Sequence, residues 1–427
     1  MNDFNSPEYK RSRGAYISQQ TAEYFVSILV TDAFLAKLLT WIGISDALAG
    51  IISSFITLAF VVQLASIFLV RLKVSAKRLT IFFDTLSIFS YMFLFFVPFI
   101  TQDKTLRTVL VVLSVLIAYI GKYLINSIAF KWANSYVEPT KRARFSANKE
   151  MISLFTGMIF TTIVGIVIDR YESLGDLEGA FLFIGVGVLV LNIVNFISFS
   201  LIKKDSKEEQ TDNSQPFKEV IKNTLGNKNF RSVIVLTVIF NIASYFTVGF
   251  IGVFKTNDLM MSMLLIQIIN VVANFARMLI SKPIAKYSDK FSYAKGMQLG
   301  LMISAAGYLA IVFTTKATWF LMIVYVVLHN CSLAGTNQNS FNIAYSYVDS
   351  KYITQAMAIK NSIGGICGFF ASLAGGKILS VIQANGNTLF GMPVYGQQVL
   401  ALISVVMLVV AIIYIRKVIA KQKVMIQ

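Results

Sequence analysis

One stretch of the sequence occurs twice. Shifting the chain against itself by 211 positions aligns residues 126–165 with residues 337–376 without a gap. Roughly a quarter of the forty aligned positions are identical, and 211 is about half of the 427 residues. The identical pairs include Asn126 with Asn337, Lys149 with Lys360, Gly157 with Gly368, and Gly165 with Gly376. This duplication predicts that the chain folds as two copies of one structural unit.

The composition places both copies in a membrane. Hydrophobic residues make up 56% of the chain and charged residues only 14%, which is too apolar for a soluble protein of this length. A helix of ~20 apolar residues spans the hydrocarbon of a bilayer, and we count twelve such stretches between Tyr24 and Arg416. Residues 1–20 are polar and lack the apolar centre of a cleaved targeting segment, so the first membrane segment is expected to be retained.

The expected fold is therefore an all-α integral membrane protein with twelve transmembrane helices in two six-helix bundles. The expected helices are 23–42, 48–70, 79–100, 106–137, 150–168, 179–202, 231–255, 259–281, 294–315, 318–347, 353–383 and 395–416. An even number of helices in each bundle makes the repeat parallel. The expected domains are 1–202, a hydrophilic cytoplasmic linker at 203–230, and 231–427. Apolar spacing after Pro216 predicts a short amphipathic helix within the linker.

The position of the basic residues explains the formal net charge of +17. Lys and Arg gather in alternate loops, at 10–13, 71–78, 141–149, 203–230, 282–295 and 416–423. The intervening loops hold few of them, and the loop that contains Asp169 and Asp176 is acidic. This distribution is the positive-inside pattern. Both termini are expected in the cytoplasm, the protein is expected in the cell membrane, and no nucleic-acid partner is needed to account for the charge.

Residues for metal, disulfide or nucleotide chemistry are scarce. The two cysteines, Cys331 and Cys367, both lie in apolar segments, and His329 is the only histidine. This pattern indicates buried thiols without a disulfide framework, and we expect no metal site and no cofactor. The phosphate-binding motif G-x-x-x-x-G-K-S/T does not occur. Energy for any transport step is therefore expected from an ion gradient.

Two parallel six-helix units joined by a cytoplasmic linker resemble the major facilitator superfamily, and the resemblance covers the whole chain. The superfamily has a loop of the type G-x-x-x-D-R/K-x-G-R/K-R/K after the second helix of each half. The second half offers, at the corresponding positions, Ala285, Asp289, Lys290, Ser292 and, one place late, Lys295. In the first half Lys77 and Arg78 fit the basic pair, but Lys73 stands at the Asp position. The architecture thus resembles the superfamily more closely than the motif does.

The resemblance implies a role for the loop at Asp289 and Lys290. In the superfamily this Asp acts as a latch that holds the cytoplasmic gate closed in one state. The alternative is a solvated ion pair worth less than ~1 kcal/mol. The Gly-Pro pair typical of antiporters in the fifth helix is missing, because residues 157–165 contain no proline. This absence disfavours drug/proton exchange.

The resemblance also implies that helices 1, 4, 7 and 10 line a central cavity, and these helices carry polar residues in their apolar segments. The expected substrate-binding residues are Asp32, Lys122, Asn126, Asn241, Tyr245, His329, Asn330, Asn337 and Gln338. A polar lining suits a hydrated ligand. The alternatives are that Asn126 and Asn337 bond to neighbouring helices, at ~0.6 kcal/mol each, and that His329 is a hydrogen-bonded core residue.

Two carboxylates are expected to couple transport to an ion. A charge at mid-bilayer costs ~2.5–3.5 kcal/mol on insertion scales, so each one needs a partner or a function. Asp32 can pair with Lys122 across the cavity, and a proton on Asp32 would free Lys122 for an anionic solute. A purely structural ion pair is the alternative. Asp84 is the second candidate for coupling or for an interhelical bond, and the sequence suggests no role for Lys377.

These features predict a secondary active transporter that moves a small polar or anionic solute by alternating access, coupled to a proton or another ion. A monomer in the lipid bilayer is expected. Efflux of amphipathic drugs or lipids is the runner-up, because 35 Phe and 15 Met residues can form an adaptable apolar site. An integral membrane lipid enzyme is a remote alternative, since clustered catalytic residues are missing. A sensor or scaffold lacks a soluble partner domain. The sequence does not identify the solute or the direction of transport.

Overall fold

The computed structural model describes residues 4–65, 69, 74–138, 141–203, 217–348 and 353–422. Apart from one short hairpin, the secondary structure in these ranges is helical. The chain divides into two compact units: unit 1 comprises residues 1–44 and 62–214, and unit 2 comprises residues 45–61 and 215–427. Residues 45–61 thus pack with the C-terminal unit although they lie early in the sequence.

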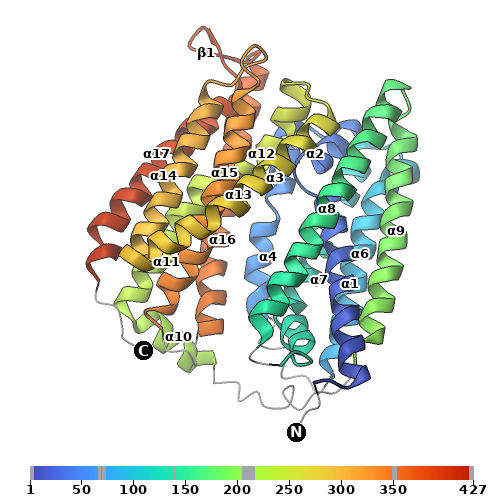
Figure 1. Cartoon of the computed structure of the whole chain (residues 1–427). Helices are drawn as coiled ribbons and strands as arrows, with labels where there is room; N and C mark the ends of the chain where they lie inside the picture. The colour runs from blue at the N-terminus through green and yellow to red at the C-terminus, as the bar shows by residue number, and fades with distance from the viewer. Residues whose placement is uncertain are drawn as a thin grey trace. The chain divides into compact units, whose positions relative to one another are not determined.

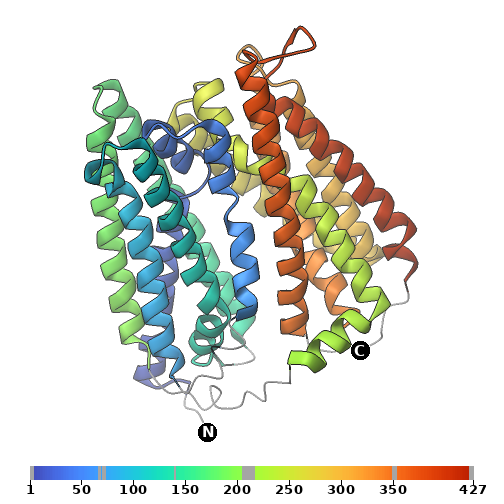
Figure 2. The ribbon, with the colours of Figure 1, turned by 180° about the vertical axis from the view of Figure 1, so that it is seen from behind.

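Unit 1 consists of long helices and one short turn of 3-10 helix. They are α1 Pro7–Leu29, α2 Asp32–Trp41, η1 Gln63–Ala65, α6 Ala76–Ile100, α7 Lys104–Asn134, α8 Arg142–Ser173 and α9 Leu177–Leu201. Helix α9 packs against α1, α6 and α8, and α6 also packs against α7. Figures 1 and 2 show these helices side by side, from blue α1 to green α9. The side chains that face one another in unit 1 therefore come from distant parts of the sequence.

Helix α1 begins at Pro7 and not at about residue 23, as the hydropathy predicted. The Ser6 side chain accepts a hydrogen bond from the backbone N–H of Tyr9 at 3.4 Å, and a proline at the first helical position is preorganised for the helix. The added turns are polar, but Ser12 and Gln19 are buried in unit 1. The helix ends at Leu29, and the chain bends by 49° before α2 begins.

Unit 2 contains the remaining elements. They are α3 Asp46–Ser53, α4 Ile56–Val62, α10 Phe217–Gly226, α11 Lys228–Tyr245, α12 Val248–Val253, the π-helix η4 Phe254–Asp258, α13 Met263–Phe291, α14 Tyr293–Val312, α15 Leu321–Tyr345, α16 Ile353–Ala384, β1 Thr388–Leu389, β2 Met392–Pro393, α17 Gly396–Lys417 and η6 Ile419–Lys421. The short helix α10 lies in the segment predicted as the linker. Helix α14 packs against α15 and α17, and α11 packs against α16 and α17.

Polar contacts fix α3 and α4 in unit 2. The Asp46 carboxylate accepts hydrogen bonds from Asn257 Nδ2 at 2.7 Å and from Gln383 Nε2 at 2.9 Å. Ser362 Oγ of α16 donates to the Phe60 carbonyl at 2.7 Å. A glycine of α16 allows close contact here: a Cβ added at Gly365 would meet the Thr57 carbonyl oxygen.

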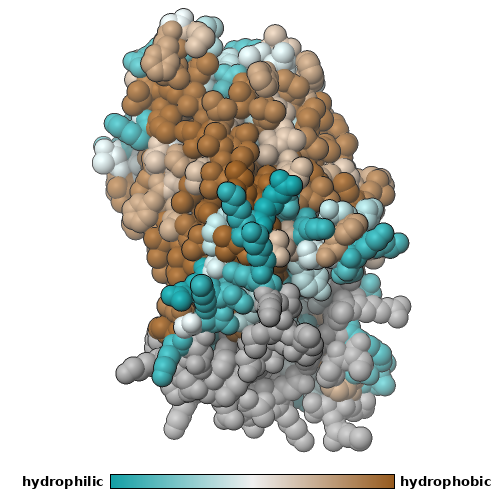
Figure 3. Space-filling view, turned by 90° about the vertical axis from the view of Figure 1, so that its left-hand side faces the viewer, coloured by the Kyte–Doolittle hydropathy of each residue, from teal (hydrophilic) through white to brown (hydrophobic). Residues whose placement is uncertain are grey.

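The surface of the helices suits a bilayer. Ten helical segments in the described residues are long and apolar enough to span a membrane, and the bent pair α1–α2 raises this number to eleven. Helix α15 has 25 residues but is not among them; its polar residues lower its hydropathy. These numbers are consistent with twelve helices. Figure 3 shows hydrophobic side chains over the upper part of one face of unit 2, with hydrophilic ones below them and a few at the upper edge.

Candidate functional site

An ion pair between α1 and α7 is the centre of the polar interior of unit 1. Lys122 Nζ lies 2.9 Å from Glu23 Oε1, and the two side chains are 27% and 18% exposed. Lys122 lies in the apolar, membrane-length part of α7, whereas the residues of α1 just before Glu23 are polar. A charge in a membrane-spanning helix is costly unless it is paired, and it usually marks a functional site. The pair of Lys122 and Glu23 is therefore the core of the candidate site.

Amide side chains of α1 extend this pair toward α8. Gln19 Nε2 and Gln20 Nε2 donate hydrogen bonds to Glu23 Oε2 at 2.8 and 2.9 Å. Gln20 Oε1 in turn accepts from Lys149 Nζ of α8 at 2.9 Å. The same Lys149 ammonium lies 4.5 Å from the centroid of the Tyr16 ring, a cation–π contact. Polar side chains of α1 thus connect the two lysines to one carboxylate.

Asp84 of α6 is a second carboxylate within electrostatic range of Glu23 and Lys122. It is 3% exposed and accepts a hydrogen bond from Asn195 Nδ2 of α9. Among the described residues, Asn195 Oδ1 and the neighbouring Asn192 Oδ1 have no hydrogen-bond partner. Buried oxygens of this kind are usually satisfied by water. The region around Asp84 is therefore suited to hold water or to exchange a proton.

The four charged groups balance one another. Glu23 and Asp84 supply two negative charges when ionised, and Lys122 and Lys149 supply two positive charges. A proton on either carboxylate leaves the group with one excess positive charge, which favours an anion nearby. Binding of a proton therefore raises the affinity of the site for an anionic or strongly polar group.

Comparison with protein families assigns the chain. The family model described as MFS/sugar transport protein, where MFS denotes the major facilitator superfamily, matches residues 79–419. The chain belongs to this family. It is therefore a multi-pass membrane transporter of the MFS fold, not an enzyme. No curated protein matches the sequence of this MFS transporter.

Solved structures with the same fold share little sequence with this MFS transporter. The nucleoside transporter NupG is 14% identical, with a TM-score of 0.70 over 98% of this chain and 100% of its own. The POT family transporter PepTSo is 12% identical, with a TM-score of 0.73 over 96% and 99% of the two chains. The D-xylose-proton symporter is 13% identical, with a TM-score of 0.70 over 95% and 97%. At these identities the likeness establishes the fold alone.

The structure gives Lys122 a partner other than the one predicted. Asp32 was the predicted partner of Lys122, but the ammonium pairs with Glu23, which lies nine positions before Asp32. Asp32 is the first residue of α2 and has a φ of 47°, so it lies at the bend between α1 and α2. The bend before Asp32 changes the direction of the chain, and Lys122 contacts Glu23 of α1 instead of Asp32.

The predicted amides of the two repeats are found on exposed helix surfaces. Asn126 on α7 and Asn337 on α15 are both exposed. Their exposure leaves their side chains accessible, as a binding role requires. The side chain of Gln338 lies outside the described residues.

The predicted residues of α11 and α15 lie in helix contacts. Asn241 and Tyr245 pack against α16 at Gly364 and Gly368, where an added Cβ would approach them at 2.6 and 2.8 Å. His329 stacks on Tyr325 with ring centroids 5.4 Å apart. These contacts favour a packing role. The remaining prediction on α15 is Asn330, whose Nδ2 donates to the Val326 carbonyl of its own helix at 3.0 Å.

The predicted gate residues lie at the end of α13. Asp289 and Lys290 are both exposed, and the Lys290 ammonium lies 5.5 Å from the Phe291 ring centroid. A latch role for them remains a prediction. Sequence reasoning did not identify Glu23, Gln19 and Asn195. The signal for the first two was available, because Gln19 and Glu23 are four residues apart on one helix face.

Proposed function

We propose that this MFS transporter is a proton-coupled secondary transporter of a small polar or anionic solute. Coupling is assigned to Glu23, Asp84 and Lys122 of unit 1. The observation that supports this proposal is the 2.9 Å pair of Lys122 and Glu23, with the Asp84 carboxylate close enough to interact with both. Because Lys122 interacts with two carboxylates, a proton on either carboxylate weakens the attraction that holds the lysine.

The proposed cycle uses this sensitivity. With both carboxylates ionised, Lys122 is held by Glu23 and the four charged groups have no excess positive charge to attract an anion. Proton binding to Glu23 removes its negative charge, and Lys122 becomes available to the solute. A ligand shifts a conformational equilibrium only by its difference in affinity between the two states. The proton and the solute therefore stabilise the same loaded state, which is what cotransport by alternating access requires.

The solute class follows from the donors present. Gln19, Gln20 and Tyr16 surround the charged groups, and such groups recognise hydroxyl, amide, carboxylate or phosphate oxygens. Two proteins of the same fold are a nucleoside transporter and a D-xylose-proton symporter. Both solutes are polar, which supports the same class. The alternating basic loops support a position in the cell membrane with both termini in the cytoplasm.

The test uses proteoliposomes that contain a pH-sensitive dye and the purified protein. A panel of nucleosides, pentoses, dipeptides and organic acids is added at neutral external pH, and internal acidification identifies a cotransported solute. Glu23→Gln is expected to abolish acidification and gradient-driven accumulation, while solute exchange at equal concentrations on both sides continues. Glu172→Gln, which removes the carboxylate that pairs with Lys37, is the matched control and should retain coupling.

Two outcomes would contradict the proposal. Full proton-coupled accumulation in Glu23→Gln and in Asp84→Asn would remove both carboxylates from the mechanism. The second outcome is that no solute of the panel is transported while a strain that overproduces the protein becomes tolerant to a broad range of hydrophobic cations. That result would favour efflux of amphipathic compounds over uptake of a polar solute.

A further inference from the structure

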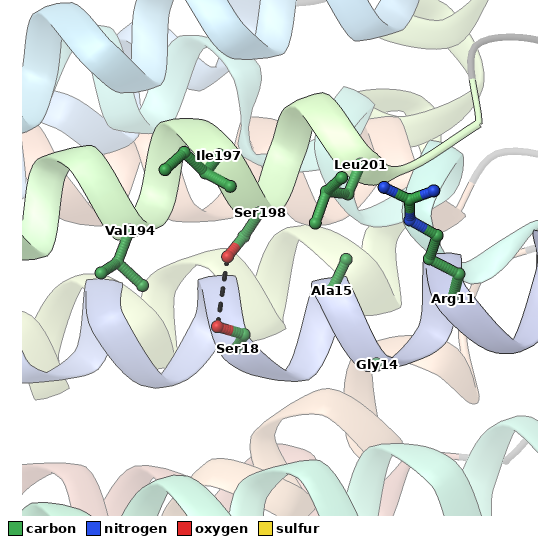
Figure 4. A pocket seen from close by; sticks show the side chains of 8 residues that line it. All are labelled: Arg11, Gly14, Ala15, Ser18, Val194, Ile197, Ser198 and Leu201. Carbon is green, nitrogen blue, oxygen red and sulfur yellow. Dashed lines mark hydrogen bonds between the residues drawn. The ribbon is translucent and has the colours of Figure 1, made fainter.

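A pocket of about 400 Å³ lies on unit 1 between the first turns of α1 and the last turns of α9 (Figure 4). The α1 side is formed by small residues, including Gly14 and Ala15, and the α9 side by Val194, Ile197 and Leu201. The missing side-chain volume on α1 creates the space. We call this pocket the α1–α9 groove.

The interior of the α1–α9 groove requires no polar ligand. The hydroxyls of Ser18 and Ser198 both line it, and Ser198 Oγ donates to Ser18 Oγ at 3.1 Å, the dashed line in Figure 4. The hydrogen-bonding groups at this point are therefore already paired with each other. The other α9 residues of the lining are aliphatic, so the groove favours an apolar occupant.

The groove opens onto an apolar surface. Val194, Ile197 and Leu201 are 38%, 50% and 39% exposed, and α9 is a membrane-length helix. In a bilayer such exposed aliphatic side chains contact acyl chains. A hydrocarbon chain can therefore enter the groove from the membrane without crossing water.

A cation marks one end of the groove. Arg11 is an exposed residue of α1, and Figure 4 shows its guanidinium beside Leu201, at the end of the groove away from Val194. In the part of the chain that the structure describes, no salt bridge to Arg11 is present. A guanidinium binds a phosphate through two parallel hydrogen bonds and is well suited to this role. Aliphatic walls with a guanidinium at one end match a phospholipid in both shape and charge.

We propose that the α1–α9 groove binds an anionic phospholipid, with one acyl chain between α1 and α9 and the headgroup phosphate on Arg11. This site is separate from the Glu23–Lys122 pair and does not depend on the transported solute. The lipid would fill the space between α1 and α9, and would hold the polar first turns of α1 at the membrane surface.

The test measures thermal unfolding of the full-length protein in a neutral detergent by tryptophan fluorescence. Phosphatidylglycerol and phosphatidylcholine with identical acyl chains are titrated separately. Phosphatidylglycerol is expected to raise the melting temperature at lower concentrations. Arg11→Gln should raise the half-saturating concentration of phosphatidylglycerol about fivefold, the effect expected of one basic residue at an anionic surface. Lys282→Gln, which removes an exposed cation from α13, is the matched control and should leave this concentration unchanged.

A second variant tests the groove itself. Gly14 has open space where its Cβ would stand, so Gly14→Leu should fill the groove without a backbone clash and abolish the stabilisation by phosphatidylglycerol. Gly187→Leu on α9, at a glycine with equally open space, should retain it. Equal stabilisation by the two lipids, or unchanged titrations in Arg11→Gln and Gly14→Leu, would overturn the proposal. The same shift with inorganic phosphate alone would also overturn it, because it would show a site for a soluble anion.

Discussion

Replacing Lys122 by alanine tests whether the ion pair in unit 1 is a buried structural charge pair. At 2.9 Å and an effective dielectric constant of ~20, the direct attraction is about 6 kcal/mol, most of which offsets the desolvation of both ions. Removing one partner of a buried pair costs ~3–5 kcal/mol. Glu23 keeps its hydrogen bonds from Gln19 and Gln20 and is 18% exposed, so we expect a cost of about 2–3 kcal/mol.

The assay is thermal unfolding followed by tryptophan fluorescence, because Trp132 of unit 1 is 1% exposed. A loss of this size should lower the melting temperature by about 5–10 °C. Lys37→Ala is the matched control, because its partner Glu172 is 42% exposed, and a pair so exposed contributes less than ~1 kcal/mol. The double variant Glu23→Gln/Lys122→Met should recover most of the loss, since no unpaired charge remains.

A melting temperature of Lys122→Ala within 2 °C of that of Lys37→Ala would contradict this prediction. A double variant as unstable as the sum of its single substitutions would contradict it too, because coupling between contacting partners must appear as non-additivity. Either result would mean that water or another group replaces Lys122 beside Glu23 at little cost in stability. The pair would then not be a buried structural ion pair.

Two further substitutions test one contact in each unit. In unit 1, Asn195→Leu should lower the melting temperature by about 4–8 °C, because Asp84 loses a charge-assisted hydrogen bond worth ~1.5–3 kcal/mol. Adding Asp84→Leu should restore most of this loss, and an unchanged melting temperature in Asn195→Leu would contradict the prediction. In unit 2, Gly365→Ala should destabilise the fold by ~1–3 kcal/mol, because its Cβ meets the Thr57 carbonyl. Gly187→Ala, at a glycine in open space, should leave the melting temperature unchanged or raise it. Equal melting temperatures in the two variants would contradict the prediction and show that α16 can shift to make room.

The sequence was sufficient to predict the fold class, because the 211-residue repeat and the apolar stretches are properties of the chain itself. The start of α1 was not predicted correctly, since hydropathy treats a polar segment as a loop. The local signals Ser6 and Pro7 were present. What they could not reveal is that Ser12 and Gln19 are buried by other helices, and that burial depends on tertiary packing.

The partner of Lys122 was beyond sequence reasoning for a geometric reason. Glu23 and Asp32 are both acidic residues of the first membrane segment, and only their depth and their direction around the helix distinguish them. The bend before Asp32, with its φ of 47°, interrupts the helical periodicity on which such an extrapolation depends. In unit 2, Asn241 and Tyr245 pack against Gly364 and Gly368 of α16, a contact that depends on tertiary packing and that the sequence did not predict.

The assignment of residues 45–61 to unit 2 has a topological consequence. The chain passes from one unit to the other between Ile44 and Ser45, again between Val61 and Val62, and a third time at residues 214–215. The units are thus tied together by three covalent crossings, two of them within twenty residues. Any relative movement of the units must be absorbed by torsions at the early crossings as well as at the late one, so the hydrophilic segment between the halves is not their sole tether.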